Sequence, residues 1–230
     1  MDVEERTRAT LRLWLMDVHG MVIAEDRRQW LGAATTADDL ALDRAVAPVL
    51  DIGCGPGRHL LALAGRGLAA LGLDVTPSAV QLARSRGAMV LQGSIFGVVP
   101  ASGTWGTALL LDGNIGIGGN PVVLLSRVGG VIRPEGRMIV ELSPPGAIGR
   151  VARARLDHKG CLGPWFDWTT VGASSIEGIA LAAGLEVSET WRTDGRWFAR
   201  IERPRQASGN GRESHPAGGR QDRQEQLARP

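Results

Sequence analysis

Three glycines alternate with other residues just after an acidic side chain, a pattern suited to holding a nucleotide. They are Gly53, Gly55 and Gly57, and Asp51 lies in the short apolar run that precedes them. Glycine lets a backbone turn sharply and lie against a ligand where a Cβ would collide. A helix that begins after such a loop presents free amide groups at its first turn. The stretch therefore predicts a ligand-binding loop between a strand and a helix.

The spacing of the glycines separates two classes of ligand. A dinucleotide-binding loop carries Gly-x-Gly-x-x-Gly, in which the last position is a glycine or an alanine. That position here is Arg58, so the pattern fails and an NAD(P)-dependent oxidoreductase is the disfavoured alternative. A carboxylate at Asp51 would also repel a pyrophosphate, whereas it suits the cationic amino group of a methionyl moiety.

The elements that position this loop alternate between short apolar runs and helical patterns, which is typical of an α/β fold with a parallel sheet. Predicted strands cover residues 49–52, 69–74, 88–91, 107–111 and 137–142. Predicted helices cover residues 58–66, 76–86, 120–132 and 174–184. Thr76 and Asn120 are the predicted caps of two helices, and Ser174 with Glu177 forms a predicted capping box. Residues 185–191 and 196–201 predict a closing hairpin.

In this setting, residues 49–57 resemble motif I of the class I S-adenosylmethionine (SAM)-dependent methyltransferases. The resemblance extends over residues 49–201. It implies an α/β, Rossmann-like three-layer sandwich, with a mostly parallel seven-stranded sheet whose C-terminal strand is antiparallel. It also implies SAM as the cofactor. Asp74 matches the family's acidic residue that binds both ribose hydroxyls, and Val75 would pack on the adenine.

Two later loops extend the resemblance. Ser94 and Ile95 follow the third strand, where the family usually has an acid near the adenine amine, so serine departs from that pattern. Leu111, Asp112 and Asn114 lie in the loop after the fourth strand, which in the family is beside the reactive methyl.

The run from residue 111 to residue 121, together with residues 195–198, looks more closely like a group of actinobacterial small-molecule methyltransferases. The resemblance implies methyl transfer to an O, N or C atom of a small molecule. Asp112 is the candidate general base and Asn114 the candidate substrate contact. The implied cofactor-binding residues are Asp51, Gly53, Cys54, Gly55, Gly57, Asp74, Val75, Ser94, Ile95, Leu111 and Asp112.

Several of these residues have a second interpretation. Asp112 can instead bond the loop amides or the cofactor, Asn114 can shape the loop, and Ser94 can bond its own backbone. Glu141, near the end of the fifth strand, is expected to pack or to point outward rather than to line the pocket. His59 is a minor base candidate, because the positive end of its helix disfavours the charged ring.

Other titratable and aromatic residues are weaker candidates. His19 is a further minor base candidate. Four tryptophans could form an aromatic wall for the substrate, although packing in the core or in a lid is the favoured interpretation. They are Trp14, Trp30, Trp165 and Trp168.

The predicted organisation is one domain with appended segments. Residues 1–45 form an N-terminal cap segment, in which residues 11–23 suggest a small hairpin. Residues 46–203 form the SAM-binding domain, and residues 147–171 are an inserted lid segment that could cover the site. Residues 204–230 carry almost no apolar side chains and are predicted to be a disordered tail.

Composition removes several classes of function. The formal net charge is only +2 despite a pI of about 8.9, and no basic cluster predicts a nucleic-acid partner. The two cysteines, Cys54 and Cys161, indicate neither a disulfide framework nor a metal site. No apolar run approaches the ~20 residues that span a bilayer, so a cytoplasmic protein without a membrane partner is expected.

Two alternatives stay open beside the oxidoreductase. One is a non-catalytic SAM-binding or interaction protein, because the resemblance is strongest at the cofactor. The other is an aminopropyltransferase, which shares the fold. An aminopropyltransferase pocket normally carries extra acids for a polyamine, and the loop here offers only Asp112.

Overall fold

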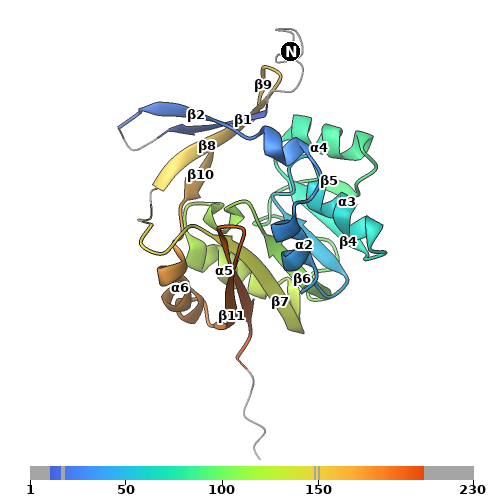
Figure 1. Ribbon diagram of the computed structural model, residues 1–230, viewed down its shortest axis with the longest axis vertical. Coiled ribbons are helices and arrows are strands. Elements are labelled where there is room, and N and C mark those ends of the chain that lie inside the picture. The colour runs from blue at the N-terminus through green and yellow to red at the C-terminus, as the bar shows by residue number, and fades with distance from the viewer. Residues whose placement is uncertain (1–10, 17–18, 148, 150, 205–230) are drawn as a thin grey trace, which may run out of the picture.

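A seven-stranded sheet forms the centre of the chain (Figure 1). The computed structural model describes residues 11–16, 19–147, 149 and 151–204. The strand order is β11-β12-β7-β6-β3-β4-β5. Strands β7 to β5 pair in parallel, whereas β12 pairs antiparallel with both β7 and β11. The predicted fold class, including the antiparallel C-terminal strand, is confirmed. The strands are β3 Val49–Ile52, β4 Ala70–Asp74, β5 Val90–Gln92, β6 Trp105–Leu110, β7 Ile132–Leu142, β11 Glu186–Thr193 and β12 Arg196–Glu202.

Helices cover both faces of this sheet, because alternate side chains of a strand point to opposite faces. Leu50 and Ile52 of β3 face one core, which α5 and α6 close. Val49 faces the opposite core, which α2 and α3 close. Figure 1 shows the two pairs of helices on either side of the sheet. The helices are α2 Thr36–Leu42, α3 Arg58–Gly65, α4 Pro77–Ser85, α5 Pro121–Gly129 and α6 Ile176–Ala182. Within the described ranges, no helix is long and apolar enough to cross a membrane.

Several predicted helix ends differ from the structure. Helix α5 ends at Gly129, and β7 begins already at Ile132, so the predicted helix to residue 132 is too long. The predicted capping box of Ser174 and Glu177 is wrong. Helix α6 begins at Ile176 after a short 3-10 helix, η3 Ala173–Ser175, and Ser174 Oγ instead accepts from Gly146 N.

The two other predicted caps have different outcomes. Asn120 caps α5 through its side chain, which accepts a hydrogen bond from Val123 N. Thr76 stands at the N-cap of α4 but makes no side-chain cap bond. A proline at the first helical position accompanies both residues and sets the start of each helix.

A second, smaller sheet lies over one end of the main domain (Figure 1), and we call it the covering sheet. Its strands are β1 Leu11–Met16, β2 Val22–Asp26, β8 Val151–His158, β9 Cys161–Leu162 and β10 Phe166–Thr169, in the order β10-β8-β1-β2 with β9 beside β8. The predicted N-terminal hairpin is confirmed as the pair of β1 and β2. The predicted inserted segment supplies the other three strands, and β8 pairs with β1.

The covering sheet attaches to the main domain where β10 contacts the loop after β6. Gly118 N donates to Asp167 O at 2.9 Å, and Ile117 forms a bridge with Trp168. Gly116, in the short 3-10 helix η2 Asn114–Gly116, is packed against the backbone of Thr169, and a Cβ there would overlap the Thr169 carbonyl oxygen. The attachment therefore requires glycine at position 116.

The predicted boundaries of the domain, the N-terminal cap segment and the lid stay proposals. Helix α2 lies within the proposed cap segment, yet its Ala37, Ala41 and Leu42 are fully buried in the core beside β3. Residues 1–10 and 205–230, the latter nearly all of the predicted tail, lie outside the described residues.

We expect Gly116→Ala to lower the free energy of unfolding by about 1–3 kcal/mol, because the added methyl group must displace the Thr169 backbone. Urea denaturation followed by circular dichroism measures the change. Gly178→Ala is the matched control. Gly178 lies in α6 with nothing within 4 Å of its Cβ position, so alanine there should be neutral or stabilising. Equal stabilities of the two variants would contradict the packing described.

Candidate active site

The glycine loop joins β3 to α3 in a left-handed backbone conformation. Gly53, Gly55 and Gly57 have φ angles of +72°, +51° and +84°, values that side-chain-bearing residues rarely adopt. A Cβ at Gly53 would lie 2.8 Å from Asn114 Nδ2, and one at Gly57 would lie 3.1 Å from Ala88 Cβ. At Gly55 nothing lies within 4 Å of that position. Two of the glycines thus allow close packing, and Gly55 borders open space.

Asp74 fastens the loop to the end of the next strand. Its Oδ2 accepts a hydrogen bond from Gly55 N at 2.8 Å, and its Oδ1 accepts one from Thr76 N, also at 2.8 Å. Burial raises the pKa of Asp74, and the two backbone N–H groups oppose that rise. Each oxygen keeps a second lone pair. Asp74 can therefore accept further hydrogen bonds from a ligand beside the loop.

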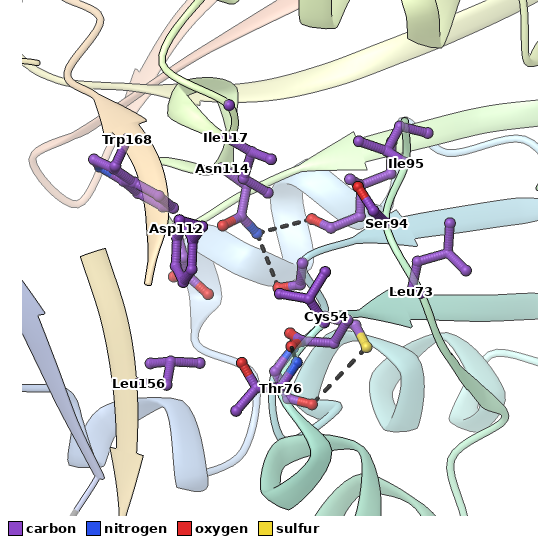
Figure 2. Close-up of a pocket in the computed structure, with 18 of the residues that line it drawn as sticks. Cys54, Leu73, Thr76, Ser94, Ile95, Asp112, Asn114, Ile117, Leu156 and Trp168 are labelled. Carbon is purple, nitrogen blue, oxygen red and sulfur yellow. Dashed lines mark hydrogen bonds between the residues drawn. The ribbon is translucent and has the colours of Figure 1, made fainter. Parts of the chain in front are cut away.

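A cavity lies beside this ribbon, between the carboxyl ends of the parallel strands and the covering sheet. Figure 2 shows Trp168 and Leu156 on one side of it and Leu73, Ser94 and Ile95 on the other. We call it the first cavity. Nine of the predicted site residues line it: Gly53, Cys54, Gly55, Asp74, Val75, Ser94, Ile95, Asp112 and Asn114.

Three predicted cofactor-binding residues do not line the first cavity, namely Asp51, Gly57 and Leu111. Leu111 is fully buried in the core beside α2, and Gly57 caps α3. Asp51 shares the strand face of Val49, so its carboxylate points toward α3, where Oδ2 lies 3.7 Å from His59 Nδ1. The premise that Asp51 and Asp74 share one cavity is therefore wrong. Contact of these three residues with a cofactor stays a prediction.

Cys54 and Ser94 both make local contacts at the wall of the first cavity. Ser94 Oγ accepts from Phe96 N at 3.2 Å, as expected for a hydroxyl that bonds its own turn. Burial and the nearby carboxylates of Asp51 and Asp74 raise the pKa of the Cys54 thiol well above its usual range. Cys54 is therefore neutral at physiological pH and is no nucleophile.

Asp112 and Asn114 follow β6 and stand where the main sheet meets the covering sheet (Figure 2). Asp112 has φ +57° and donates its backbone N–H to Glu141 Oε2 at 2.7 Å. Its Oδ1 accepts a hydrogen bond from Arg58 at 2.6 Å. Asn114 Nδ2 donates to the carbonyls of Ile52 and Gly53 at 2.9 and 3.0 Å. Asn114 thus has the loop-shaping contacts, and its contact with a substrate stays a prediction.

A buried cluster of charges supports this junction. Asp38 Oδ1 lies 2.8 Å from Arg196 Nη1 and 3.2 Å from Arg58 Nη2. Arg196 also forms two hydrogen bonds with Glu141, at 2.6 and 2.8 Å. Burial would raise the pKa of Asp38, but hydrogen bonds from His59, Thr35 and Arg196 outweigh it and hold the pKa well below its usual range.

The protonation state of His59 differs from the one that its position in the sequence predicted. Burial lowers its basicity, but the contact with Asp38 and the nearby carboxylate of Asp51, 3.7 Å away, outweigh that effect and raise the pKa of His59 to about 9. The two adjacent carboxylates therefore outweigh the positive potential at the N-terminus of α3, which was expected to disfavour the charged ring. Arg58 Nε lies 3.1 Å from His59 Nε2 and could donate a hydrogen bond to it only if the imidazole were neutral. The two carboxylates favour the protonated imidazole instead. His59 lines neither this cavity nor the one described below.

Sequence reasoning missed four members of the cluster: Asp38, Arg58, Glu141 and Arg196. A signal existed for one of them, because Thr35 and Asp38 form a capping box at the start of α2. Asp38 Oδ2 accepts from Thr35 N at 2.8 Å, and Thr35 Oγ1 accepts from Asp38 N at 3.3 Å. Glu141 does not line the first cavity and is held by Arg196, as a packing role predicts, but it also lines a neighbouring cavity.

Two further candidates take no part in the first cavity. His19 is exposed near the turn between β1 and β2 and lines neither cavity. Trp14 and Trp165 also line neither, whereas Trp30 and Trp168 line both. Within the described residues, no group of His, Cys, Asp and Glu side chains could hold a metal ion.

We expect the charged His59 to make the stability fall with alkaline pH. The pKa of His59 is raised from 6.5 to about 9 in the folded chain, so its protonated ring stabilises the fold. This stabilisation is fully present below pH 6.5 and is lost as the pH rises through 9. The loss should be on the order of 1–3 kcal/mol. Urea denaturation from pH 6 to pH 10 measures it.

His59→Gln is the comparison for this measurement. It should be less stable than the wild type at pH 7 and should lack the fall attributed to the imidazole. The buried Cys54 thiol adds an alkaline loss to both proteins, so the difference between their curves isolates His59. Parallel curves would show that the ring is neutral in the folded chain.

Comparisons with known proteins agree with this geometry. Residues 49–136 match a family model described as a methyltransferase domain. No curated protein matches the chain. A Bacteroides fragilis SAM-dependent methyltransferase in complex with S-adenosyl-L-homocysteine has a similar structure (TM-score 0.69, 22% identity, covering 86% of this chain and 89% of that one). A Burkholderia thailandensis 1,6-didemethyltoxoflavin-N1-methyltransferase also has a similar structure (TM-score 0.57, 18% identity, covering 77% of this chain and 81% of that one).

A third similar structure is the CcbJ methyltransferase from Streptomyces caelestis, with a TM-score of 0.59 and 14% identity over 76% of this chain and 92% of that one. At these identities the structures show the fold alone, and the closer resemblance to actinobacterial enzymes stays a prediction. The family model covers the glycine loop, Asp74, Ser94 and Asp112. The match to the methyltransferase-domain model spans residues 49–136, and the chain has the fold of class I methyltransferases.

Proposed function

We propose that this chain is a SAM-dependent methyltransferase that methylates an O, N or C atom of a small molecule. One observation carries the proposal: the open ribbon at Gly55 and the carboxylate of Asp74 border a mostly apolar cavity that ends at Asp112. The Bacteroides fragilis structure with S-adenosyl-L-homocysteine and the Burkholderia thailandensis enzyme, which acts on a small molecule, support it.

The residues present fit SAM. The cradle at Gly55 is one that a Cβ would fill. Val75 and Ile95 offer an apolar contact for the adenine, and Asp74 keeps lone pairs for the ribose hydroxyls. A pyrophosphate beside the loop would meet the carboxylate of Asp74 and would be repelled by it, whereas Asp112 in the same cavity is paired with Arg58. This charge pattern disfavours the oxidoreductase.

SAM would supply a methyl group that its sulfonium already activates. The chain must then align the nucleophile and exclude water from the site. The covering sheet excludes water by placing Leu13, Leu156 and Trp168 over the first cavity. Asp112 stands at the end of that cavity with its backbone held by Glu141, so a carboxylate is available there to accept a proton.

A cytoplasmic location, the lack of a nucleic-acid or membrane partner, and the acceptor atom stay predictions. A non-catalytic SAM-binding protein is distinguished by turnover, measured as release of S-adenosylhomocysteine with a panel of small molecules.

Calorimetry with SAM and S-adenosylhomocysteine tests cofactor binding directly. We expect the wild type to bind both ligands and Asp74→Asn to bind them at least ~10-fold more weakly, because the carboxylate accepts hydrogen bonds from the ribose and from Gly55. Asp43→Asn, an exposed position at the end of α2, should bind like the wild type. No heat with either ligand on the folded wild type would reject the proposed function.

A second prediction uses two glycines with similar backbones. Gly55 and Gly67 both have positive φ and nothing within 4 Å of a Cβ, but only Gly55 lines the first cavity. Alanine at either position should cost about 1–2 kcal/mol of stability. Only Gly55→Ala should also weaken S-adenosylhomocysteine binding, by ~10-fold or more, because its methyl group enters the cavity. Calorimetry and urea denaturation give the two readouts. Equal affinities of the two variants would place the cofactor elsewhere.

A further inference from the structure

A second cavity, of about 750 Å³, adjoins the first. Its volume lies within the range of roughly 300–1,000 Å³ that small-molecule sites occupy. Five residues line both cavities and so mark the junction: Leu13, Trp30, Arg58, Asp112 and Trp168. If SAM lies along the glycine loop, a molecule in the second cavity meets it at this junction.

The walls at the junction suit a flat ring. Trp30, from the 3-10 helix η1 Arg28–Leu31, and Trp168, from β10, line both cavities there, and the guanidinium of Arg27 covers one face of the Trp30 ring. Both pack against the buried cluster of Leu13, Ala154 and Leu156. Deeper in the second cavity the walls include the apolar side chains of Ile115 and Val171. Rings stack favourably on such aromatic walls.

The charges of the second cavity disfavour an anionic occupant. Of its described lining residues, three are guanidiniums and four are carboxylates, Glu25, Asp112, Glu141 and Asp194. Each guanidinium is already paired: Arg27 with Glu25, Arg58 with Asp38 and Asp112, and Arg196 with Asp38 and Glu141. An anion would find no unpaired cation there and would be repelled by the excess of carboxylate.

One carboxylate oxygen at the junction is available to the occupant. Arg58 takes Oδ1 of Asp112, and among the described residues nothing donates a hydrogen bond to Oδ2. The side chain is 20% exposed, so Oδ2 can be reached from the cavities. An ionised carboxylate accepts hydrogen bonds and donates none. The matching group on the occupant is therefore an O–H or N–H donor.

We propose that the second cavity binds the methyl acceptor, and that the acceptor is a flat unsaturated ring of neutral or positive charge carrying an O–H or N–H donor that bonds Asp112 Oδ2. This inference rests on the proposed function. The acceptor oxygen or nitrogen forms a bond to the methyl carbon while the sulfur–methyl bond breaks and leaves a neutral thioether. The proton of the acceptor passes to Asp112.

Ligand-observed NMR on the full chain saturated with S-adenosylhomocysteine tests the charge preference. The probes are single-ring and fused-ring fragments in matched neutral, ammonium-bearing and carboxylate-bearing forms. Neutral and ammonium forms should bind at least ~5-fold more tightly than carboxylate forms. Equal or tighter binding of the carboxylates, or no binding of any ring, would overturn the proposal. The proposed function survives either result, because S-adenosylhomocysteine binding is measured first.

Two Leu→Trp variants locate the binding. Leu15 lines only the second cavity, so Leu15→Trp should fill it and weaken fragment binding ~10-fold or more while S-adenosylhomocysteine affinity stays within ~3-fold. Leu40→Trp, at a 39% exposed position on α2, should change neither affinity. Fragment binding that survives in folded Leu15→Trp would place the acceptor outside the second cavity.

A tryptophan pair provides a second location test should Leu15→Trp fail to fold. Trp168→Ala should weaken fragment binding, whereas Trp165→Ala should not. Trp165 lines neither cavity and stacks instead with Arg155, whose guanidinium carbon is 4.5 Å from its ring centroid. Equal fragment affinities of the two variants would overturn the assignment of the aromatic wall.

The role of Asp112 is tested with fragments that differ by one methyl group. Rings with an O–H should bind wild type about 10-fold more tightly than their O-methyl forms, because only the former donate to the carboxylate. In Asp112→Asn this preference should shrink to within ~2-fold. A preference that is unchanged in Asp112→Asn would show that the donor bonds another group.

Discussion

The buried carboxylate of Asp38 connects the parts of the chain that meet at the proposed active site. It caps α2, pairs with Arg58 at the start of α3, and pairs with Arg196 at the start of β12. Through these two guanidiniums it reaches Asp112 and Glu141. A charge that is fully buried is tolerated only when it is paired and hydrogen-bonded. The positions of Arg58 and Arg196 are therefore set by the need to satisfy Asp38.

This arrangement changes the electrostatic account of the glycine loop. The sequence placed two carboxylates, Asp51 and Asp74, around a single ligand. In the structure Asp74 borders the first cavity, while Asp51 lies behind the loop and faces the imidazole of His59. The negative character of the cavity comes instead from Asp74 and Asp112. Repulsion of a pyrophosphate therefore depends on Asp74, because Arg58 lines the same cavity and pairs with Asp112.

Local patterns predicted much of the fold and of the cofactor side of the site. The glycine loop and Asp74 were identified because strand, turn and helix signals lie next to each other in the sequence. The direction of Asp51 follows from the same strand, since it lies two residues after Val49 and therefore shares its face. That step was available from the sequence and was missed.

The charge cluster could not be predicted in the same way. Arg196 is 158 residues from Asp38 and 55 from Glu141 in the sequence. Nothing in the neighbourhood of either carboxylate shows which guanidinium will reach it, because the pairing depends on how β12 and α2 pack. The pairing of β1 with β8, and hence the covering sheet, has the same origin. The predicted capping box at Ser174 is wrong for a related reason. Its hydroxyl accepts a hydrogen bond from the distant Gly146 N instead of capping the helix that follows it in the sequence.

The covering sheet is built from two stretches, 11–26 and 151–169, that lie on either side of the methyltransferase domain match at residues 49–136. The walls that the covering sheet contributes thus lie outside the segment that carries the glycine loop, although Asp112 and Ile115 of that segment also line the second cavity. Mutations can accumulate in the two outer segments while the nucleotide-holding segment stays intact. Exchange of the two outer segments would therefore replace part of the wall of the second cavity while leaving the glycine loop unchanged.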